Sequence, residues 1–210
     1  ILSDVIRQAE TCGEPLEGVQ ALFLYPLNAL IQSQKERFSA WTAPYKGKIR
    51  YCLYNGNLPE NQKHTVELRG KPEEILDREH LWQSPPPLLI TNPTMLEYML
   101  IRKKDNNILK ASQGKLRYIV LDEAHTYMGS QAAELSLLLK RVLAAFGVTK
   151  ENVKFIASSA TIGGDDAAKQ LQRFLASIAG IKENQVEVVF GTRCIDRYKT
   201  STQTNESLEY

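Results

Sequence analysis

The stretch "YIVLDEAHTYMGS" (residues 118–130) joins an apolar run to two carboxylates and, two residues later, to a histidine. The apolar run predicts a buried strand, and a carboxylate at the end of a buried strand is costly unless it has a partner or a ligand. Adjacent strand residues point to opposite faces, so Asp122 and Glu123 suit two separate roles. Asp122 would hold a magnesium ion beside a nucleotide, and Glu123 would orient the attacking water. The plainer alternative is an aspartate that caps a helix in a surface turn.

The spacing of apolar residues predicts strands and helices that alternate along the chain. The expected strands are 19–26, 48–56, 88–91, 115–122, 153–160 and 185–190. The expected helices are 3–10, 27–41, 72–82, 93–103, 130–146 and 165–180, with an exposed loop at 57–71. Such alternation predicts an α/β fold, a doubly wound parallel sheet with helices on both faces. We expect one domain over residues 1–192 and a linker or frayed tail over residues 193–210.

Composition limits the class of protein. The chain has 210 residues, of which 43% are hydrophobic and 24% charged, with a net charge of +2. This charge excludes a grossly basic nucleic-acid coat protein but permits binding through one local face. No apolar run approaches the roughly 20 residues that span a bilayer, and no signal peptide opens the chain. The three cysteines, Cys12, Cys52 and Cys194, form no C-x-x-C pair, and free thiols in a reducing cytosol indicate a cytoplasmic protein.

Unusual residues follow five of the expected strands. In a parallel sheet, ligands bind beyond the carboxyl ends of the strands, so these residues should share one edge. The sequences are "YPLNA" (25–29), "YNGN" (54–57), "TNPT" (91–94), "DEAH" (122–125) and "SSAT" (158–161). His125 could connect the acidic pair to a neighbouring loop, with Ser159 and Thr161 as its partners. The alternative is a surface histidine and ordinary turn hydroxyls.

Two proline turns share one design, in which a strand leads through a proline into a helix. Proline is tolerated at the first helical position, and the N–H groups of that turn face outward and can bind an anion. We therefore expect Pro26 and Pro93 to mark sites for two successive phosphates of a nucleic-acid strand. Side chains that could reach sugar and phosphate are Asn28, Thr91, Asn92 and Thr94, and Gly56 allows a close backbone approach. Simple helix capping is the alternative.

Residues 102–117 form a basic strip. It holds six basic residues against Asp105 alone: Arg102, Lys103, Lys104, Lys110, Lys115 and Arg117. The strip could face phosphates, or it could be a solvated loop. Three aromatic side chains, Trp41, Tyr98 and Tyr127, could stack on bases or pack in the core.

The series "YPLNAL", "YNGN", "TNPTMLEYML", "VLDEAH" and "SSAT" resembles, in order and rough spacing, the motifs of superfamily 2 helicases. The resemblance covers residues 1–192 and corresponds to the first RecA-like domain of those enzymes. "LNALIQSQKERF" and "TNPTMLEYMLIR" are most similar to the large bacterial DEAH-type helicases of the Lhr-like and MrfA-like groups.

The resemblance implies a role for each motif. Asp122 would coordinate Mg²⁺, Glu123 would be the catalytic base, and both would lie at the ATP. Three residues, His125, Ser159 and Thr161, would couple hydrolysis to strand movement. The residues along the nucleic acid would be Pro26, Asn28, Gly56, Asn57, Thr91, Asn92, Pro93 and Thr94. The implied function is an ATP-dependent DNA helicase or translocase in DNA repair or phage defence, acting on single-stranded or tailed DNA together with a second RecA-like domain.

One motif of such enzymes is missing. The phosphate-binding loop has the form G-x-x-x-x-G-K-[ST], and the Gly-Lys pairs at 47–48, 70–71 and 114–115 do not fit it. The chain begins inside what looks like the helix after this loop, so we expect the loop upstream of Ile1 and no activity from residues 1–210 alone. Two alternatives stay open: a non-catalytic RecA-like scaffold that binds nucleic acid, and a double-stranded DNA translocase that does not unwind.

Overall fold

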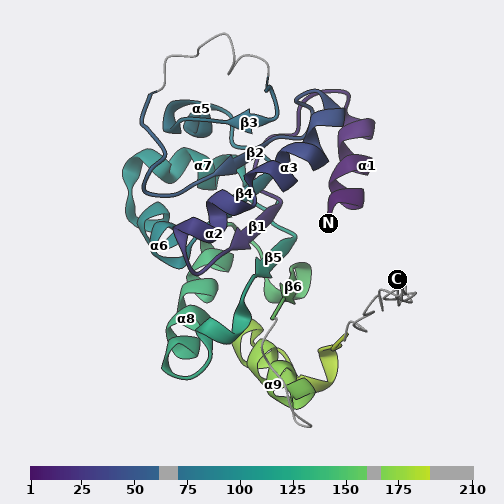
Figure 1. The fold of residues 1–210 in the computed structure, drawn as a ribbon, viewed down its shortest axis with the longest axis vertical. Coiled ribbons are helices and arrows are strands. Elements are labelled where there is room, and N and C mark those ends of the chain that lie inside the picture. The colour runs from purple at the N-terminus through teal and green to yellow at the C-terminus, as the bar shows by residue number, and fades with distance from the viewer. Residues whose placement is uncertain (62–70, 160–166, 190–210) are drawn as a thin grey trace, which may run out of the picture.

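A parallel sheet of six strands forms the centre of the molecule in this computed structural model, which describes residues 1–61, 71–159 and 167–189 (Figure 1). The strands are β1 (Ala21–Leu24), β2 (Tyr51–Leu53), β3 (Glu74–Ile75), β4 (Leu88–Thr91), β5 (Tyr118–Leu121) and β6 (Lys154–Ala157). Their order is β3-β2-β4-β1-β5-β6, and every neighbouring pair is parallel. The predicted α/β class is confirmed.

Helices connect the strands. The α-helices are α1 (Leu2–Cys12), α2 (Asn28–Ser33), α3 (Lys35–Thr42), α5 (Arg78–Gln83), α6 (Pro93–Ile101), α7 (Asn106–Ala111), α8 (Ser130–Ala145) and α9 (Ala167–Ala179). Short 3₁₀ turns are η1 (Ala43–Tyr45), η2 (Lys103–Asp105), η3 (Ala124–Tyr127), η4 (Lys150–Asn152) and η5 (Glu183–Gln185). Within the described ranges, none of these helices combines the length and the apolar character needed to cross a membrane.

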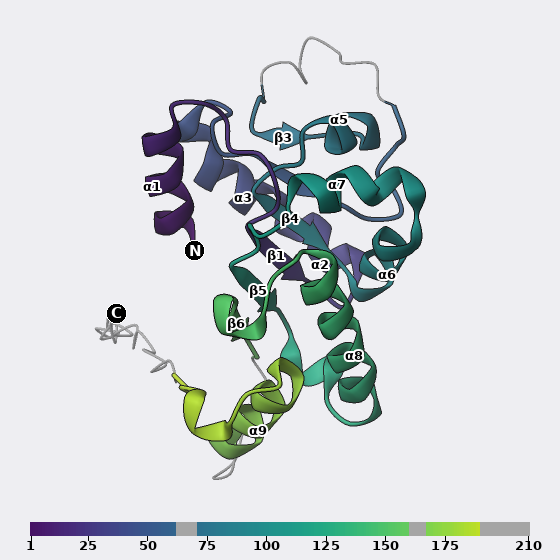
Figure 2. The same cartoon turned by 180° about the vertical axis from the view of Figure 1, so that it is seen from behind.

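The strand order decides which face each helix covers. From β1 the chain moves outward to β2 and β3, and then returns through β4 and past β1 to β5 and β6. Crossovers between parallel strands are right-handed, so a reversal of direction moves the following helices to the opposite face. Accordingly α1, α2 and α3 pack on one face, and α5 to α9 pack on the other (Figures 1 and 2).

Each face of the sheet has its own apolar core. Along β1, Ala21 and Phe23 join the core under α1 to α3, while Leu22 and Leu24 join the core under α5 to α9. All four β1 residues are buried. A strand covered on both faces must be apolar at every position, which explains why the central strands are continuous apolar runs and do not alternate with polar residues.

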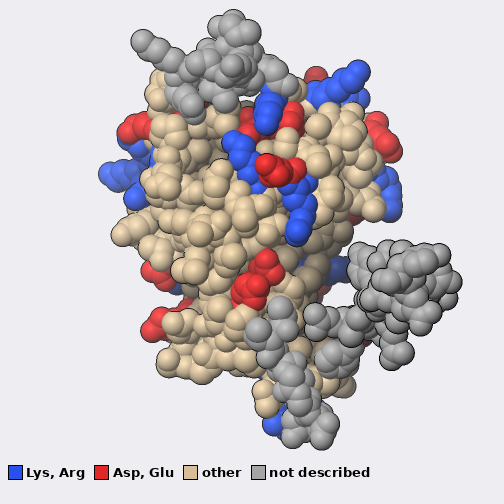
Figure 3. Space-filling view, in the orientation of Figure 1, with Lys and Arg blue, Asp and Glu red and all other residues tan. Residues whose placement is uncertain are grey.

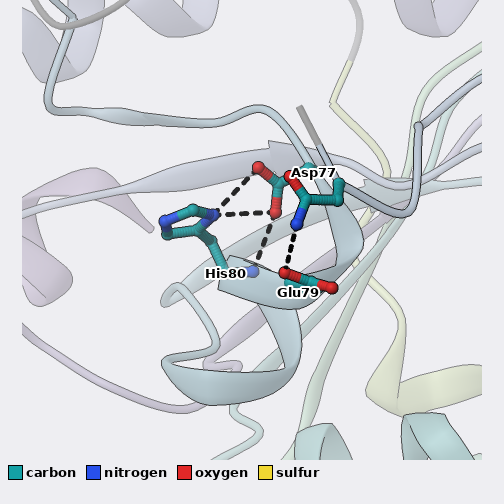
Figure 4. A network of polar contacts seen from close by, with 4 residues as sticks. Asp77, Glu79 and His80 are labelled. Carbon is teal, nitrogen blue, oxygen red and sulfur yellow. Dashed lines mark hydrogen bonds and ion pairs between the residues drawn. The ribbon is translucent and has the colours of Figure 1, made fainter. Parts of the chain in front are cut away.

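The predicted helix 72–82 is wrong in its first half. Glu74 and Ile75 form the edge strand β3, paired with Tyr51 and Cys52 of β2. The helix begins only after Asp77, whose carboxylate caps it by accepting a hydrogen bond from the His80 backbone N–H at 2.9 Å. Figure 4 shows the His80 ring turned back to the same carboxylate, with Nδ1 at 2.8 Å from Oδ1. The capping aspartate therefore sets the start of the helix, six residues after the first predicted position.

Two further predictions differ from the structure. The expected helix 27–41 is divided at Gln34 into α2 and α3. The expected strand 185–190 is wrong over its described residues, because Gln185 ends η5 and residues 186–189 pair with no strand. There the side-chain amide of Gln172 donates to the carbonyls of Glu183 at 2.8 Å and Val186 at 3.2 Å. Of the expected strand residues, Val186 thus has its carbonyl bonded to α9 and not to a neighbouring strand. Residues 193–210, the expected tail, lie outside the described residues.

The buried carboxylate of Asp105 connects three elements on the face of the sheet that α5 to α9 cover. Asp105 of η2 is fully buried and accepts hydrogen bonds from the Tyr54 hydroxyl and the Trp82 indole N–H, each at 2.7 Å. Burial, together with the bond to this carboxylate, raises the pKa of Tyr54 above its ordinary value. Buried polar groups are stable only when they are paired, so this cluster fixes how α5 and η2 sit against the end of β2.

We expect Tyr54→Phe to lower the free energy of unfolding by about 1–3 kcal/mol, because Asp105 would keep only one of its two donors. Urea unfolding of residues 1–210, followed by circular dichroism, measures this change. Tyr98→Phe is the matched control, since Tyr98 is 43% exposed, and it should change stability by less than about 0.5 kcal/mol. Equal effects of the two substitutions would contradict a structural role for the Asp105 cluster.

Candidate functional site

The five unusual turns lie on one edge of the sheet, in an order set by the strands. The turn after β2 comes first, followed by the turns after β4, β1, β5 and β6. The expected nucleic-acid residues therefore occupy the β2–β4–β1 side, and the expected catalytic residues occupy the β5–β6 side. The two groups also follow one another along the chain, at residues 26–94 and 122–161, and the sheet places their boundary between β1 and β5.

The two proline turns are bonded to each other. Asn92 donates from Nδ2 to Asn28 Oδ1 at 2.7 Å, and its own Oδ1 accepts from the Met95 backbone N–H at 2.8 Å. The second bond caps α6. The backbone adds a third link, from the Tyr25 N–H to the Thr91 carbonyl at 3.0 Å. The turns after β1 and β4 therefore form one connected unit.

Burial separates the expected nucleic-acid residues into two kinds. Thr91 is fully buried and donates to the Tyr54 carbonyl at 2.6 Å, and Asn92 is only 8% exposed. These two side chains hold the turns. The remaining residues are partly or fully exposed on the edge: Pro26, Asn28, Gly56, Asn57, Pro93 and Thr94.

The turn after β2 is held by its own side chain. The Asn55 carboxamide Oδ1 accepts from the Asn57 backbone N–H at 2.9 Å, which is an Asx turn. A Cβ atom built on Gly56 would meet no atom of the described chain within 4 Å. Packing within this part of the chain therefore does not require a glycine here, and the space above its backbone is open.

The acidic pair lies just beyond β5. The Asp122 backbone N–H donates to the Leu24 carbonyl at 3.0 Å, and its Oδ1 accepts from the Ser158 hydroxyl and from the Glu123 N–H. Glu123 has φ 49° and ψ 47°, in the left-handed region that non-glycine residues rarely adopt. The strand has already ended at Leu121. The two carboxylates are therefore arranged by this left-handed turn, and the expectation that strand pleating separates them is wrong.

His125 lies between the acidic pair and the loop after β6. Its Nδ1 is 3.3 Å from Glu123 Oε2 and 3.3 Å from Ser159 Oγ. The backbone supports this arrangement, because the Ala124 N–H donates to the Ser158 carbonyl at 2.8 Å. Thr161, the other expected partner, lies outside the described residues. The geometry thus brings four of the five expected catalytic residues together.

Two tyrosines, Tyr25 and Tyr127, lie near the charge of Asp122, a position that reasoning from the sequence did not predict. Burial and the charge of Asp122 raise the pKa of Tyr25 to about 12, although the charge of Arg37 acts to lower it. Burial and Asp122 likewise raise the pKa of Tyr127 above its ordinary value. Both hydroxyls therefore stay protonated near the carboxylate. Tyr127 is 5% exposed, so of the two earlier alternatives it packs in the core, whereas Tyr98 and Trp41 are each 43% exposed.

A cavity of about 960 Å³ joins the two halves of the edge. The proline turns, α6, η3 and α8 line it, and its lining includes Glu123 and His125 as well as Pro26 and Pro93. Exposed apolar side chains also line it, among them Leu27 at 63% and Ile101 at 68%. A ligand that occupies this cavity would contact both halves.

The site could supply one carboxylate, that of Asp122, to a magnesium ion. In the described ranges, no three His, Cys, Asp or Glu residues are grouped as a complete metal site. Magnesium beside a nucleotide commonly takes one or two carboxylates and completes its shell with water and phosphate oxygens. The hydrogen bonds of the Asp122 carboxylate within the described chain are both at Oδ1, which leaves Oδ2 for a metal. Asp122 therefore suits a metal that arrives with a nucleotide.

Comparison with known proteins gives one family. The family described as "DEAD/DEAH box helicase" matches residues 3–170. Among curated proteins, the chain is 34% identical over 127 residues to Druantia protein DruE of Escherichia coli, and the match covers 57% of this chain and 7% of that protein. It is 29% identical over 149 residues to the uncharacterized ATP-dependent helicase YprA of Bacillus subtilis, covering 70% of this chain and 17% of that protein. The chain thus spans less than a fifth of the length of these relatives.

Solved structures share the fold. The DUF1998 helicase MrfA bound to DNA and AMPPNP matches with a TM-score of 0.56 at 23% identity, covering 86% of this chain and 21% of that chain. The crystal structure of MrfA bound to DNA matches with a TM-score of 0.55 at 25% identity and the same coverage. The described sheet and its helices therefore have the arrangement of one part of a much longer chain.

We expect Asn92→Ala to lower the free energy of unfolding of residues 1–210 by about 1–2 kcal/mol, because it removes the cap of α6 and the bond to Asn28. Asn92→Asp keeps an oxygen that can cap the helix, and it should cost less than Asn92→Ala. Urea unfolding of both variants checks the order. Equal losses would contradict the assignment of Asn92 as a helix cap.

Proposed function

The chain belongs to the DEAD/DEAH box helicase family, and from this premise we propose that it is part of an ATP-dependent DNA helicase or translocase. Nucleic-acid-stimulated ATP hydrolysis would drive strand movement. The observation that carries the proposal is the division of one sheet edge into a half with an acidic pair and a half with two bonded proline turns. These halves meet at a single cavity.

The β5–β6 half would carry the hydrolysis. Asp122 would hold Mg²⁺, which supplies positive charge to the phosphates of ATP and so stabilises the charge that develops in phosphoryl transfer. Glu123 would orient the attacking water and accept its proton. Its left-handed backbone and the 3.3 Å contact with His125 define where its carboxylate lies.

The loops after β5 and β6 would couple hydrolysis to movement. Nδ1 of His125 contacts both Glu123 and Ser159, so a shift of the loop after β6 would change the surroundings of the proposed catalytic base. Thr161, in the same "SSAT" sequence, would take part in this coupling. A second RecA-like domain is the partner that we propose to move against this edge.

The β2–β4–β1 half would bind single-stranded or tailed DNA. The exposed residues are the proposed contacts, namely Pro26, Asn28, Gly56, Asn57, Pro93 and Thr94. The buried residues Thr91 and Asn92 would act by holding the turns in place. The open space above Gly56 supports this proposal, because a sugar-phosphate backbone could approach the chain closely there.

A non-catalytic scaffold is the second candidate. A scaffold would not need the contacts of Asp122 with Ser158 and of Glu123 with His125, so these contacts favour the enzyme. A translocase that does not separate strands would use the same site. The proposed setting is a cytoplasmic enzyme of DNA repair or phage defence, and loss of resistance to DNA damage or to phage in a deletion strain would distinguish the two pathways.

In the complete protein that contains this chain, we expect Glu123→Gln to lower the rate of DNA-stimulated ATP hydrolysis by about 100-fold or more, because a general base contributes about 10²–10⁴ in rate. Binding to single-stranded DNA should remain. A phosphate-release assay and fluorescence anisotropy measure the two properties. Glu10→Gln, an exposed substitution on α1 with the same change of charge, is the control and should leave both unchanged. A Glu123→Gln protein that keeps its ATPase rate would exclude Glu123 as the base.

We expect residues 1–210 alone to hydrolyse no ATP, because no G-x-x-x-x-G-K-[ST] loop occurs among them. The phosphate-release assay with and without single-stranded DNA tests this expectation. Hydrolysis well above that of the Glu123→Gln version of the same fragment would contradict it. Displacement of a labelled strand from tailed DNA by the complete protein then separates unwinding from translocation alone.

A further inference from the structure

A second cavity, of about 400 Å³, lies beside the turn after β2. The proposed hydrolysis and the two proline turns do not use it. It opens between α5 and η2, and its walls are unusually basic. The lining residues are Glu60, Arg78, Trp82, Arg102, Lys103, Lys104 and Asp105.

The fold assembles this cavity from separate parts of the sequence. Arg78 begins α5, whereas Arg102 directly follows α6 and leads into Lys103 and Lys104 of η2. In Figure 3 basic side chains gather at the left margin of the molecule, at the height of α7 in Figure 1. Four positive side chains around one small cavity predict an anion as the ligand.

The basic strip of residues 102–117 is divided by the fold. Only its first three basic residues line the cavity. Lys115 and Arg117 lie at the amino end of β5, where Lys115 donates to the Glu17 carbonyl at 3.0 Å and Arg117 pairs with Asp4 at 3.3 Å. The strip is therefore not one phosphate-facing surface, and its two ends can be compared by mutation.

The two acidic residues of the cavity do not cancel its charge. Asp105 is fully buried and is engaged by Tyr54 and Trp82, so it serves the core. Glu60 forms an ion pair with Lys104, and the hydrogen bond and charge of Lys104 hold the pKa of Glu60 below its usual range. Both side chains of that pair are more than half exposed, and exposed pairs are weak. A phosphate could replace Glu60 at Lys104.

Several of the side chains are held in place before any ligand binds. Arg78 donates from Nε to the Leu58 carbonyl at 2.9 Å and from Nη2 to the Asn55 carbonyl at 3.2 Å. The guanidinium of Arg102 lies 4.6 Å from the centre of the Tyr98 ring, and Lys104 Nζ lies 5.3 Å from that of Trp82. Cations positioned by aromatic rings and carbonyls lose less freedom when they bind a phosphate.

The position of the cavity indicates which phosphate it takes. The two carbonyls that accept from Arg78 belong to Asn55 and Leu58, which flank Gly56 and Asn57 on either side. The cavity therefore adjoins the exposed turn after β2, at the end of the edge that lies farthest from β5 and β6 in the strand order. A strand that runs across the proline turns and the Gly56 turn would reach this cavity next.

We propose that this cavity binds a backbone phosphate of the nucleic-acid strand and extends the binding edge beyond the Gly56 turn. Arg102 and Lys103 supply the charge, Arg78 fixes the turn next to it, and the Trp82 ring forms an apolar wall for a sugar or a base. The inference rests on the proposed function, since it assigns the next contact of the same strand.

The test compares two double variants of the complete protein. Arg102→Gln with Lys103→Gln removes two charges at the cavity, and Lys115→Gln with Arg117→Gln removes two at the amino end of β5. The cavity variant should bind a fluorescent single-stranded DNA at least fivefold more weakly at low salt. Its plot of log affinity against log salt should be less steep by about 0.7, because one phosphate contact contributes about 0.7 for single strands. The control variant should match the unmodified protein in both respects.

Each outcome decides between the possibilities. Equal binding by the two variants overturns the cavity proposal and leaves the proposed function intact, since DNA binding and Glu123-dependent ATPase persist. A complete protein that binds no DNA overturns both. Titration with inorganic phosphate and with ATP distinguishes the source of the anion. If the cavity variant binds these two ligands more weakly but binds DNA as the unmodified protein does, the cavity takes a free anion and the proposal fails. Thermal unfolding verifies that the variants are folded.

Discussion

The pairing of β1 with both β4 and β5 is the constraint on which the rest of the structure depends. Leu24, the last residue of β1, lies beside Thr91 on one side and Leu121 on the other. Hydrogen bonds continue past the strand ends, from Tyr25 to Thr91 and from Asp122 to Leu24. Because these bonds fix the three turns in register, a displacement of β1 would move the proline turns and the acidic pair together.

This central pairing also explains why the two halves of the edge can differ in chemistry. On the β4 side the polar groups satisfy one another, with Asn92 bonded to Asn28 and Thr91 bonded to the carbonyl of Tyr54. On the β5 side the polar groups converge on Asp122 and His125. In the first half, buried side chains bond the turns to one another and the residues beside them are exposed. The second half is a cluster of ionisable groups. The proline turns follow β4 and β1 and the acidic pair follows β5, so neighbouring strands carry the two kinds of group.

The apolar pattern of the sequence was sufficient to predict the α/β class and the central strands, because a strand buried on both faces has to be apolar throughout. It failed for Glu74 and Ile75, since an edge strand of two residues has no period to detect. It also failed over the described residues of 185–190, where the apolar residues suggested a strand but the Val186 carbonyl bonds to a glutamine of α9. In the site, the motif letters located Asp122, Glu123, His125 and Ser159 along one edge. Their distances, the burial of Thr91 and the role of Tyr25 depend on contacts between residues far apart in sequence, which no local pattern contains.

The left-handed backbone of Glu123 has a consequence for how this position tolerates change. A side chain in that region is strained by about 1–2 kcal/mol relative to glycine, which adopts it freely. Glycine would therefore be the residue that the local backbone prefers, whereas this chain carries a carboxylate there, in contact with His125. Backbone stability therefore favours glycine at position 123, whereas the proposed role in hydrolysis requires a carboxylate. The residue that this backbone prefers would thus remove the carboxylate that we propose as the catalytic base.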